Sequence, residues 1–126
     1  MVQNSLSYDK AYNFAIRVVK AYQFLQTEKK EFILSKQLLR SGTSIGANLA
    51  EANGAISRND FSAKTSIAYK ECLETKYWLS LLKDTNYIDE KMFSSMFDDA
   101  DEISKMLFST IKTTRINKTK PVAIAD

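Results

Sequence analysis

Residues that break helices are scarce in this chain, which has three glycines and one proline in 126 residues. Sandwiches and barrels built from short strands need a turn about every 8–12 residues, and those turns depend on glycine and proline. The only proline is Pro121, so no earlier segment is interrupted by one. The sequence therefore favours long helices over a β-sandwich or a β-barrel.

The composition is that of one folded domain. The hydrophobic share is 44% and the charged share 26%, which is typical of a globular chain and not of a disordered one. No stretch approaches the roughly 18 apolar residues that a membrane span requires. Asp9 and Lys10 interrupt the N-terminal region before any apolar run develops, so no secretory signal is visible. We expect a cytoplasmic protein without a membrane partner.

Several kinds of chemistry are disfavoured by residues that are missing. The chain has no histidine, which excludes Ser-His-Asp and Cys-His catalysis and the commonest transition-metal ligand. Carboxylates three residues apart, such as Glu71 and Glu74, resemble part of a di-iron bundle site, but that site also needs Glu-x-x-His pairs. The single cysteine, Cys72, lies on an apolar helix face and is interpreted as core packing. We expect no enzyme activity, no metal and no cofactor.

Four amphipathic helical segments follow one another with short connections. Apolar residues recur every three or four positions, and Ser57 and Asp89 are suited to cap the third and fourth segments. Asn53-Gly54 closes the second segment, with Gly54 expected in a left-handed cap. The segments cover about residues 7–27, 31–53, 57–85 and 89–115. This pattern predicts an all-α, antiparallel up-down-up-down four-helix bundle over residues 1–115 and a flexible basic tail over 116–126.

The first segment is apolar on more than one face. One stripe contains apolar residues at 8, 11, 12, 15, 18, 19, 22 and 25. Four more apolar side chains lie outside that stripe, at Phe14, Ile16, Ala21 and Phe24. A helix with two apolar faces needs two partner surfaces, so we infer contact with another copy of the chain in addition to the bundle core.

The second segment is rich in small residues around Gly42 and Gly46. Glycines four residues apart share one helix face, which favours close approach of a neighbouring helix. A phosphate-binding loop is the competing interpretation, but no Gly-Lys-Ser/Thr follows and no strand-like run precedes.

A polar stripe runs along the second and third segments among apolar neighbours. If the two segments meet, Arg40 is expected to pair with Glu71 or Glu74, with Asn48 forming a hydrogen bond nearby. We interpret the stripe as a structural network within or between subunits, and a ligand or partner surface is the alternative. Its members are Gln37, Arg40, Ser44, Asn48, Glu51, Glu71 and Glu74.

Charge is spread unevenly, although the net charge is only +3. Residues 8–30 carry five cations against two anions, whereas residues 88–111 carry six anions against two cations. The acidic run at 98–102 is interpreted as a solvated face or a partner for the cations of the first segment. The alternative to a solvated basic surface is contact with nucleic acid. The candidate contacts are Lys10, Arg17, Lys20, Lys29, Lys30, Lys112, Arg115, Lys118 and Lys120.

Two stretches carry a resemblance to a known family. Residues 36–52, Lys-Gln-Leu-Leu-Arg-Ser-Gly-Thr-Ser-Ile-Gly-Ala-Asn-Leu-Ala-Glu-Ala, are the first. The second comprises Asp60-Phe61, residues 67–72 and residues 74–79. Together they resemble the bacterial four-helix-bundle proteins called ribosomal-RNA intervening-sequence proteins, over roughly residues 8–115. Many relatives have glycine where this chain has Ala52, which suggests a sub-branch.

The resemblance implies a homopentameric ring. It also implies a fold similar to the accessory variability proteins of diversity-generating retroelements, which bind nucleic acid and a reverse transcriptase. On that basis we expect a non-enzymatic, homo-oligomeric adaptor that contacts RNA, DNA or a reverse transcriptase-like protein through basic surfaces. The alternative is a protein-only scaffold that binds a polypeptide in a groove or pore. In a pentamer the charge of +3 per chain would become about +15.

Overall fold

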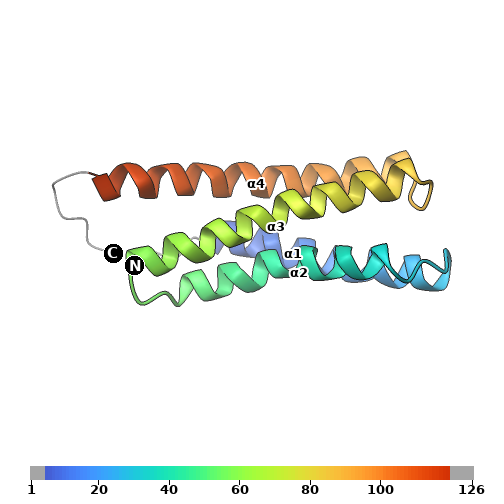
Figure 1. Ribbon diagram of the computed structural model, residues 1–126, viewed down its shortest axis with the longest axis horizontal. Coiled ribbons are helices and arrows are strands. Elements are labelled where there is room, and N and C mark those ends of the chain that lie inside the picture. The colour runs from blue at the N-terminus through green and yellow to red at the C-terminus, as the bar shows by residue number, and fades with distance from the viewer. Residues whose placement is uncertain (1–4, 120–126) are drawn as a thin grey trace.

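The computed structural model describes residues 5–119, with side chains for residues 6–114, and most of these residues lie in four helices. The helices are α1 (Ser5–Thr27), α2 (Leu34–Asn53), α3 (Arg58–Asp84) and α4 (Glu90–Thr119). Figure 1 shows them alongside one another, with the α1–α2 and α3–α4 connections at one end and the α2–α3 connection at the other. No strand occurs among the described residues, and the predicted four-helix, all-α class is confirmed.

The core forms where apolar side chains of consecutive helices meet. On α3 the residues spaced three and four apart from Thr65 through Cys72 to Leu82 are buried and form a seam along the helix. Helices α2 and α3 share the most extensive contact, and α1 with α2 and α3 with α4 follow. Of the neighbouring helices, α1 and α4 approach each other least, and within the described residues the backbones of α1 and α3 do not come close to each other. The helices α1 and α3 therefore lie diagonally across the bundle.

The helix starts follow the predicted caps. The Ser57 hydroxyl accepts a hydrogen bond from the backbone N–H of Asp60, as expected for a capping box. Asp89 accepts from the backbone N–H of Met92 at 2.8 Å. Each cap satisfies a backbone donor that has no partner inside its helix.

The start of α2 differs from its prediction. The helix begins at Leu34 and not near Glu31, because the Glu31 carboxylate itself accepts from the backbone N–H groups of Ile33, Leu34 and Ser35. Burial of this carboxylate works against its charged form, but the three N–H groups outweigh burial and lower the pKa of Glu31. Glu31 is thus the anionic cap of α2.

The prediction of a left-handed cap at Gly54 is wrong. Gly54 has φ of −99° and ψ of 15°, and its N–H bonds to the carbonyl of Glu51 at 3.1 Å. The left-handed positions are instead Lys30, with φ of 54°, and Asn86, with φ of 69°. Both residues turn the chain after a helix at the same end of the bundle.

Helix α1 is rotated relative to its predicted facing. Phe14 and Ala21, placed outside the core stripe, are buried, whereas Tyr12 and Val19, placed inside it, are exposed. Periodicity alone could not choose between two overlapping apolar stripes. Val18 belongs to the predicted stripe and stays buried, and it packs closely against α2, because the Cβ that an alanine would have at Gly42 lies only 2.7 Å from Cγ2 of Val18. Close approach is thus found at Gly42 as the small residues suggested.

The C-terminal helix extends beyond the position at which its pattern stops. Helix α4 continues to Thr119, four residues past Arg115. No glycine or proline occurs between these two positions to end the helix. Residues 116–119 of the expected tail are therefore helical, and residues 120–126 lie outside the described part.

Candidate functional site

A forked ion pair joins α2 to α3. Arg40 Nη1 lies 3.4 Å from Glu71 Oε2, and Arg40 also donates to Glu74 through Nη2. Trp78 Nε1 donates to the same Glu74 carboxylate at 2.9 Å. The hydrogen bonds from Arg40 and then from Trp78 hold the pKa of Glu74 below its usual range. Because the Arg40 side chain is 49% exposed, the pair sets helix register more than it adds stability.

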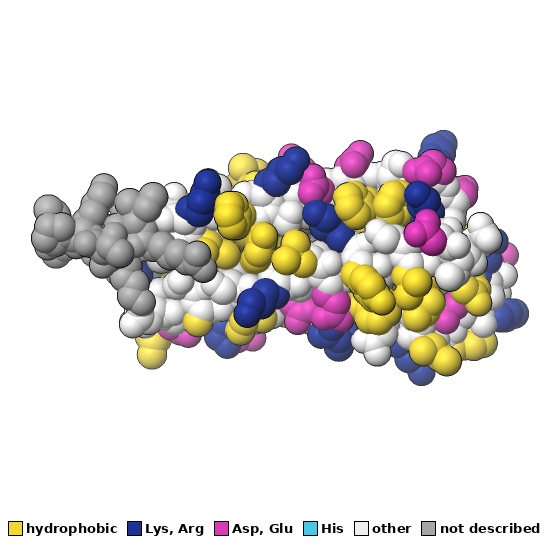
Figure 2. All heavy atoms as spheres, turned by 45° about the horizontal axis from the view of Figure 1, so that its top comes forward, with side chains coloured by type: hydrophobic (Ala, Val, Ile, Leu, Met, Phe, Trp, Pro, Cys, Tyr) yellow, Lys and Arg dark blue, Asp and Glu magenta, His cyan; other side chains and the backbone are white. Residues whose placement is uncertain are grey.

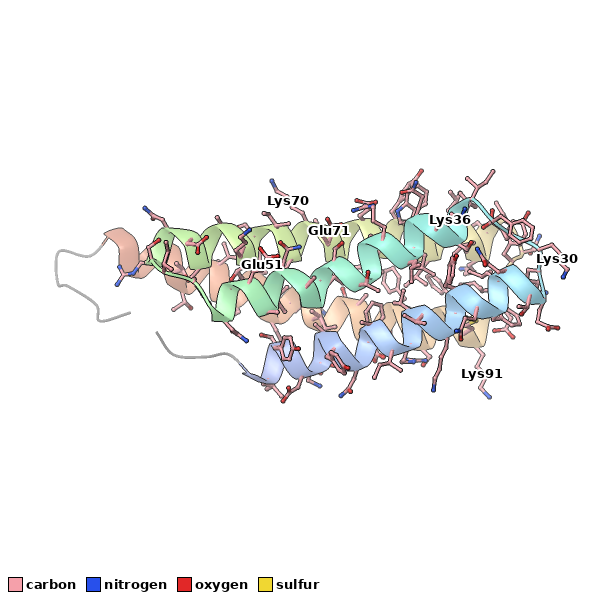
Figure 3. All side chains as sticks on the ribbon, turned by 90° about the horizontal axis from the view of Figure 1, so that it is seen from below. Lys30, Lys36, Glu51, Lys70, Glu71 and Lys91 are labelled. Atoms are coloured by element: carbon pink, nitrogen blue, oxygen red, sulfur yellow. The ribbon has the colours of Figure 1, made fainter. Side chains whose placement is uncertain are left out.

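The rest of the polar stripe is divided between cross-helix and local contacts. Glu51 forms an ion pair with Lys64 of α3 at 2.7 Å. Ser44 donates to the carbonyl of Arg40, and Asn48 donates to the carbonyl of Ser44, so neither side chain reaches the Arg40 cluster. Gln37 is exposed and makes no side-chain hydrogen bond with the described residues. Figure 3 shows Glu51 and Glu71 along the line where α2 passes α3.

The cations of α1 are occupied by α4. Arg17 Nη1 lies 2.5 Å from Asp99 Oδ2, and Lys10 Nζ lies 3.3 Å from Glu102 Oε1. On sequence grounds the acidic run at 98–102 is interpreted as a solvated face or as a partner for cations of the first segment. Asp99 and Glu102 are such partners. Between the helices is a hollow of about 170 Å³, lined in part by Asn13. Lys10 and Arg17 are therefore poorly placed to bind phosphate.

The other predicted nucleic-acid contacts are scattered. Lys20 and Lys30 are exposed, Lys29 Nζ lies 5.9 Å from the ring centre of Phe24, and Lys112 Nζ lies 5.1 Å from that of Phe108. The side chains of Arg115 and Lys118, and the whole of Lys120, lie outside the described residues.

Two exposed lysines missed by the sequence reasoning, Lys36 on α2 and Lys91 on α4, lie toward the same end of the bundle as Lys30 but on opposite sides of it. Figure 3 shows Lys30, Lys36 and Lys91 toward the end of the bundle with the α1–α2 and α3–α4 connections, whereas Lys70 lies farther along α3. Lys36 and Lys91 are far apart in sequence, and only the folding of the helices places them at one end. The sequence signal that could have placed them at one end is that both lie in the first turn of a helix, and in an up-down bundle the second and fourth helices start at the same end.

An apolar ridge runs along the outside of α1. Tyr12, Ile16 and Val19 are 56%, 43% and 38% exposed, and their three- and four-residue spacing puts them on one face. We call these three residues the α1 ridge. Because α1 buries a different face in its own bundle, the second apolar face inferred from the sequence exists, although Ile16 is the only off-stripe residue in it.

A groove between α3 and α4 carries the second apolar surface. The rings of Tyr69 and Phe108 lie 5.7 Å apart, and Leu73 beside them is 43% exposed. Figure 2 shows hydrophobic side chains gathered over this side of the molecule. The groove has a volume of about 290 Å³. Its charged residues are paired, because Asp101 forms ion pairs with Lys76 and Lys105. We call it the α3–α4 groove; its lining is Tyr69, Leu73, Lys76, Asp101, Ser104, Lys105 and Phe108.

The one cysteine is sealed in the core. Cys72 is fully buried, and burial raises the pKa of its thiol to about 12. A protonated, inaccessible thiol is not a nucleophile at neutral pH. Among the described residues no group of three or more carboxylates and thiols is arranged to hold a metal ion. The surfaces above are thus the features with potential for function.

Comparison with known proteins agrees with the bundle just described. The sequence model of the 23S rRNA-intervening sequence proteins matches residues 3–109. The chain belongs to this family. A crystal structure at 1.70 Å of a protein of unknown function from the S23 ribosomal protein family of Bacteroides thetaiotaomicron VPI-5482 is similar to it. That protein is 51% identical, with a TM-score of 0.86, over 88% of this chain and 99% of the other.

No curated protein matched this member of the family. None of the helices within the described residues combines the length and the apolar character that crossing a membrane demands.

Proposed function

We propose that this intervening-sequence protein is a non-enzymatic cytoplasmic adaptor, assembled from several copies, that binds nucleic acid or a nucleic-acid enzyme through basic surfaces. The assembly we favour is a homopentameric ring of up-down-up-down bundles. The observation that carries the proposal is the pair of exposed apolar surfaces on diagonally placed helices, the α1 ridge and the α3–α4 groove.

The two surfaces are suited to each other across copies of the chain. Exposed apolar side chains at helical spacing, such as Ile16 on the ridge and Leu73 in the groove, mark contact sites when they form a continuous patch. Because the α1 ridge and the α3–α4 groove lie on different helices, a ridge-to-groove contact joins different surfaces of two copies. Contacts of that kind close into rings when the rotation permits.

Cross-helix pairs support the up-down order. Arg40 meets Glu71 and Glu74, while Glu51, farther along α2, meets Lys64, earlier on α3. Later residues of one helix thus face earlier residues of the next, as expected for antiparallel neighbours.

Assembly is tested by mass measurement with two single variants. Ile16→Lys puts a charge on the ridge and Leu73→Lys puts one in the groove, and each alone should give monomers in native mass spectrometry. A mixture of the two retains one intact ridge and one intact groove, so it should form a one-to-one dimer. A monomeric unmodified protein at 100 µM, or a mixture that stays monomeric, contradicts ridge-to-groove assembly.

The nucleic-acid part of the proposal is supported by the basic sequence, with net charge +3 and an isoelectric point of about 8.9. Repetition around a ring would multiply contacts that are weak singly. Fluorescence anisotropy with labelled RNA and DNA at 50 mM and 200 mM salt should show binding that weakens as salt rises. An intact assembly that binds no nucleic acid at 50 mM salt rules this part out.

A further inference from the structure

One threonine of α3 has a buried hydroxyl without a hydrogen-bond partner. Thr65 is 2% exposed, and among the described residues its Oγ1 is the one buried side-chain oxygen or nitrogen that is unpaired. An unpaired hydroxyl destabilises a fold, because it loses its hydrogen bonds to solvent and gains none in return. Native structures pair nearly all buried polar groups, and an ordered water serves where no protein group is in place. Thr65 therefore indicates a further hydrogen-bonding group beside it.

Most other threonines in the helices satisfy their hydroxyl locally. Thr75, which is fully buried on the same seam of α3, donates to the carbonyl of Glu71 at 2.7 Å. The equivalent acceptor for Thr65 is the carbonyl of Phe61, and the Thr65 hydroxyl does not bond to it. The threonines that donate to the carbonyl four residues earlier are Thr27, Thr43, Thr75, Thr85, Thr110 and Thr114. Thr65 thus departs from a rule that its own helix otherwise follows.

A small cavity to which all four helices contribute is lined by Thr65. Its volume is about 10 Å³, which is the lower limit for one water molecule and too little for an organic ligand. It lies toward the end of the bundle that has the α2–α3 connection, where α2 ends and α3 begins. The described lining is Ser7, Leu49, Ala52, Asn53, Phe61, Thr65, Leu107 and Thr110.

The lining offers a water molecule several hydrogen-bond partners. Thr110 Oγ1 donates to the carbonyl of Met106 at 3.1 Å, so its lone pairs are able to accept. Ser7 of α1, which is 1% exposed, contributes another hydroxyl oxygen. The Thr65 hydroxyl supplies a donor, because its proton has no other acceptor. An ordered internal water needs about two to four polar partners, and three hydroxyls meet that number.

The apolar members of the lining separate these hydroxyls from solvent. Leu49, Ala52 and Leu107 are between 0% and 4% exposed, whereas Asn53 and Phe61 are half-buried. A hydrogen bond formed in such surroundings is not weakened by competition with bulk water. The cavity therefore combines the size, the donor and the acceptors that a single water requires.

We propose that this cavity binds one ordered water molecule, which accepts a hydrogen bond from Thr65 and donates to the hydroxyls of Ser7 and Thr110. The water joins α3 to both α1 and α4. Helices α1 and α4 have the least extensive contact of any neighbouring pair, so the bridge between Ser7 and Thr110 lies where direct packing contributes least. The site does not depend on the proposed function.

The direction of one substitution separates a hydrated hydroxyl from an orphaned one. Thr65→Val keeps the shape of the side chain and removes the hydroxyl. If the water is bound, the variant loses one of its hydrogen bonds, and the equilibrium constant of unfolding should rise about 2- to 10-fold in guanidinium denaturation of the full chain. An orphaned hydroxyl would give the opposite result, because its removal relieves a cost. An unfolding constant that stays the same or falls overturns the proposal.

A control and a second substitution tie the effect to the cavity. Thr43→Val removes a hydroxyl that donates to the carbonyl of Leu39 at 2.7 Å outside this lining, and it should change the unfolding constant less than about twofold. Thr110→Val and the double variant with Thr65→Val complete a cycle. Because one water contacts both hydroxyls, the double variant should lose less than the product of the single effects, by at least about twofold. Purely multiplicative effects contradict a shared water.

A crystal structure of the full chain at about 1.5 Å resolution tests the site directly. Electron density for a water within about 3 Å of Thr65 Oγ1, and its loss in Thr65→Val, is the expected result. A Thr65 side chain that is rotated to donate to the carbonyl of Phe61, with no water in the cavity, overturns the proposal.

Discussion

Two arginines, Arg40 and Arg17, form ion pairs across two pairs of helices that differ in how closely they pack. Arg40 of α2 reaches two carboxylates on α3, where the contact between helices is most extensive and Trp78 joins the cluster. Arg17 of α1 reaches Asp99 and the Ser95 hydroxyl on α4, where contact is least and a hollow of about 170 Å³ lies beside the pair. Similar ion pairs thus lie over a closely packed seam in one case and an open seam in the other.

The difference shows that an ion pair does not by itself indicate tight packing. Along α2–α3 the Thr75 and Ser41 hydroxyls lie 3.0 Å apart and are fully buried, so backbone proximity is set by small residues. Along α1–α4 the charged side chains reach across the space. We expect stability to depend on packing in the first seam and on electrostatics in the second.

The largest expected effect contrasts two substitutions to leucine. Ser41→Leu inserts volume into the packed α2–α3 seam and should lower the free energy of unfolding by about 2–3 kcal/mol. Asn13→Leu places a comparable side chain at the hollow of the α1–α4 seam and should change it by less than about 0.5 kcal/mol. Guanidinium denaturation measures both. Equal losses would show that the two seams are equally packed.

Arg40→Ala should have the next largest effect, about 1 kcal/mol of lost stability. The substitution leaves Glu71 and Glu74 close together without their shared cation, so the loss should exceed that of an ordinary surface pair. Thermal melting measures it, and Lys70→Ala is the control for removing an exposed cation near α3. A melting temperature equal to that of the control would contradict the expected role of the fork.

The pH dependence of stability tests the contribution of Glu74 to the α2–α3 seam. The pKa of Glu74 is lower in the folded protein than in the unfolded chain, so its contribution is present at neutral pH and is lost as pH falls below about 4.5. In Glu74→Gln the stability curve between pH 5 and pH 3 should be shallower than in the unmodified protein. An unchanged slope would mean that other carboxylates account for the acid sensitivity.

The smallest effect is expected at the open seam. Arg17→Ala should cost about 0.5 kcal/mol, because both side chains of the pair are about two-fifths exposed. Raising salt from 50 mM to 1 M should reduce the difference between the variant and the unmodified protein toward zero. A difference that persists in 1 M salt would indicate that the arginine stem packs in the seam.

The sequence predicted the helices better than their facing. Few breakers, the Ser57 and Asp89 caps and the α3 seam located all four helices, because each signal is local. The rotation of α1 could not be predicted from the sequence, because Tyr12 and Phe14 are both apolar and only the folded bundle shows that Phe14 is the buried one.

Site residues could be predicted from the sequence where regular helix spacing related them, and were missed where only folding brings them to one part of the molecule. Arg40 was matched with Glu71 and Glu74 because their spacing was regular on two consecutive helices. Lys36 and Lys91 were not grouped, because 55 residues separate them and only the folded bundle places both toward one end. The α3–α4 groove was missed for the same reason, since Leu73 and Phe108 come from different helices.

Because Cys72 is buried, a second cysteine placed on the surface can be labelled selectively to count the chains in an assembly. Cys72 is the only cysteine in the sequence, and its thiol stays protonated and enclosed while the fold is intact. A Lys70→Cys substitution would introduce a single reactive thiol for maleimide dyes, with Cys72 serving as an internal report of unfolding. Stepwise photobleaching of such labelled particles would then give the number of chains in one assembly directly.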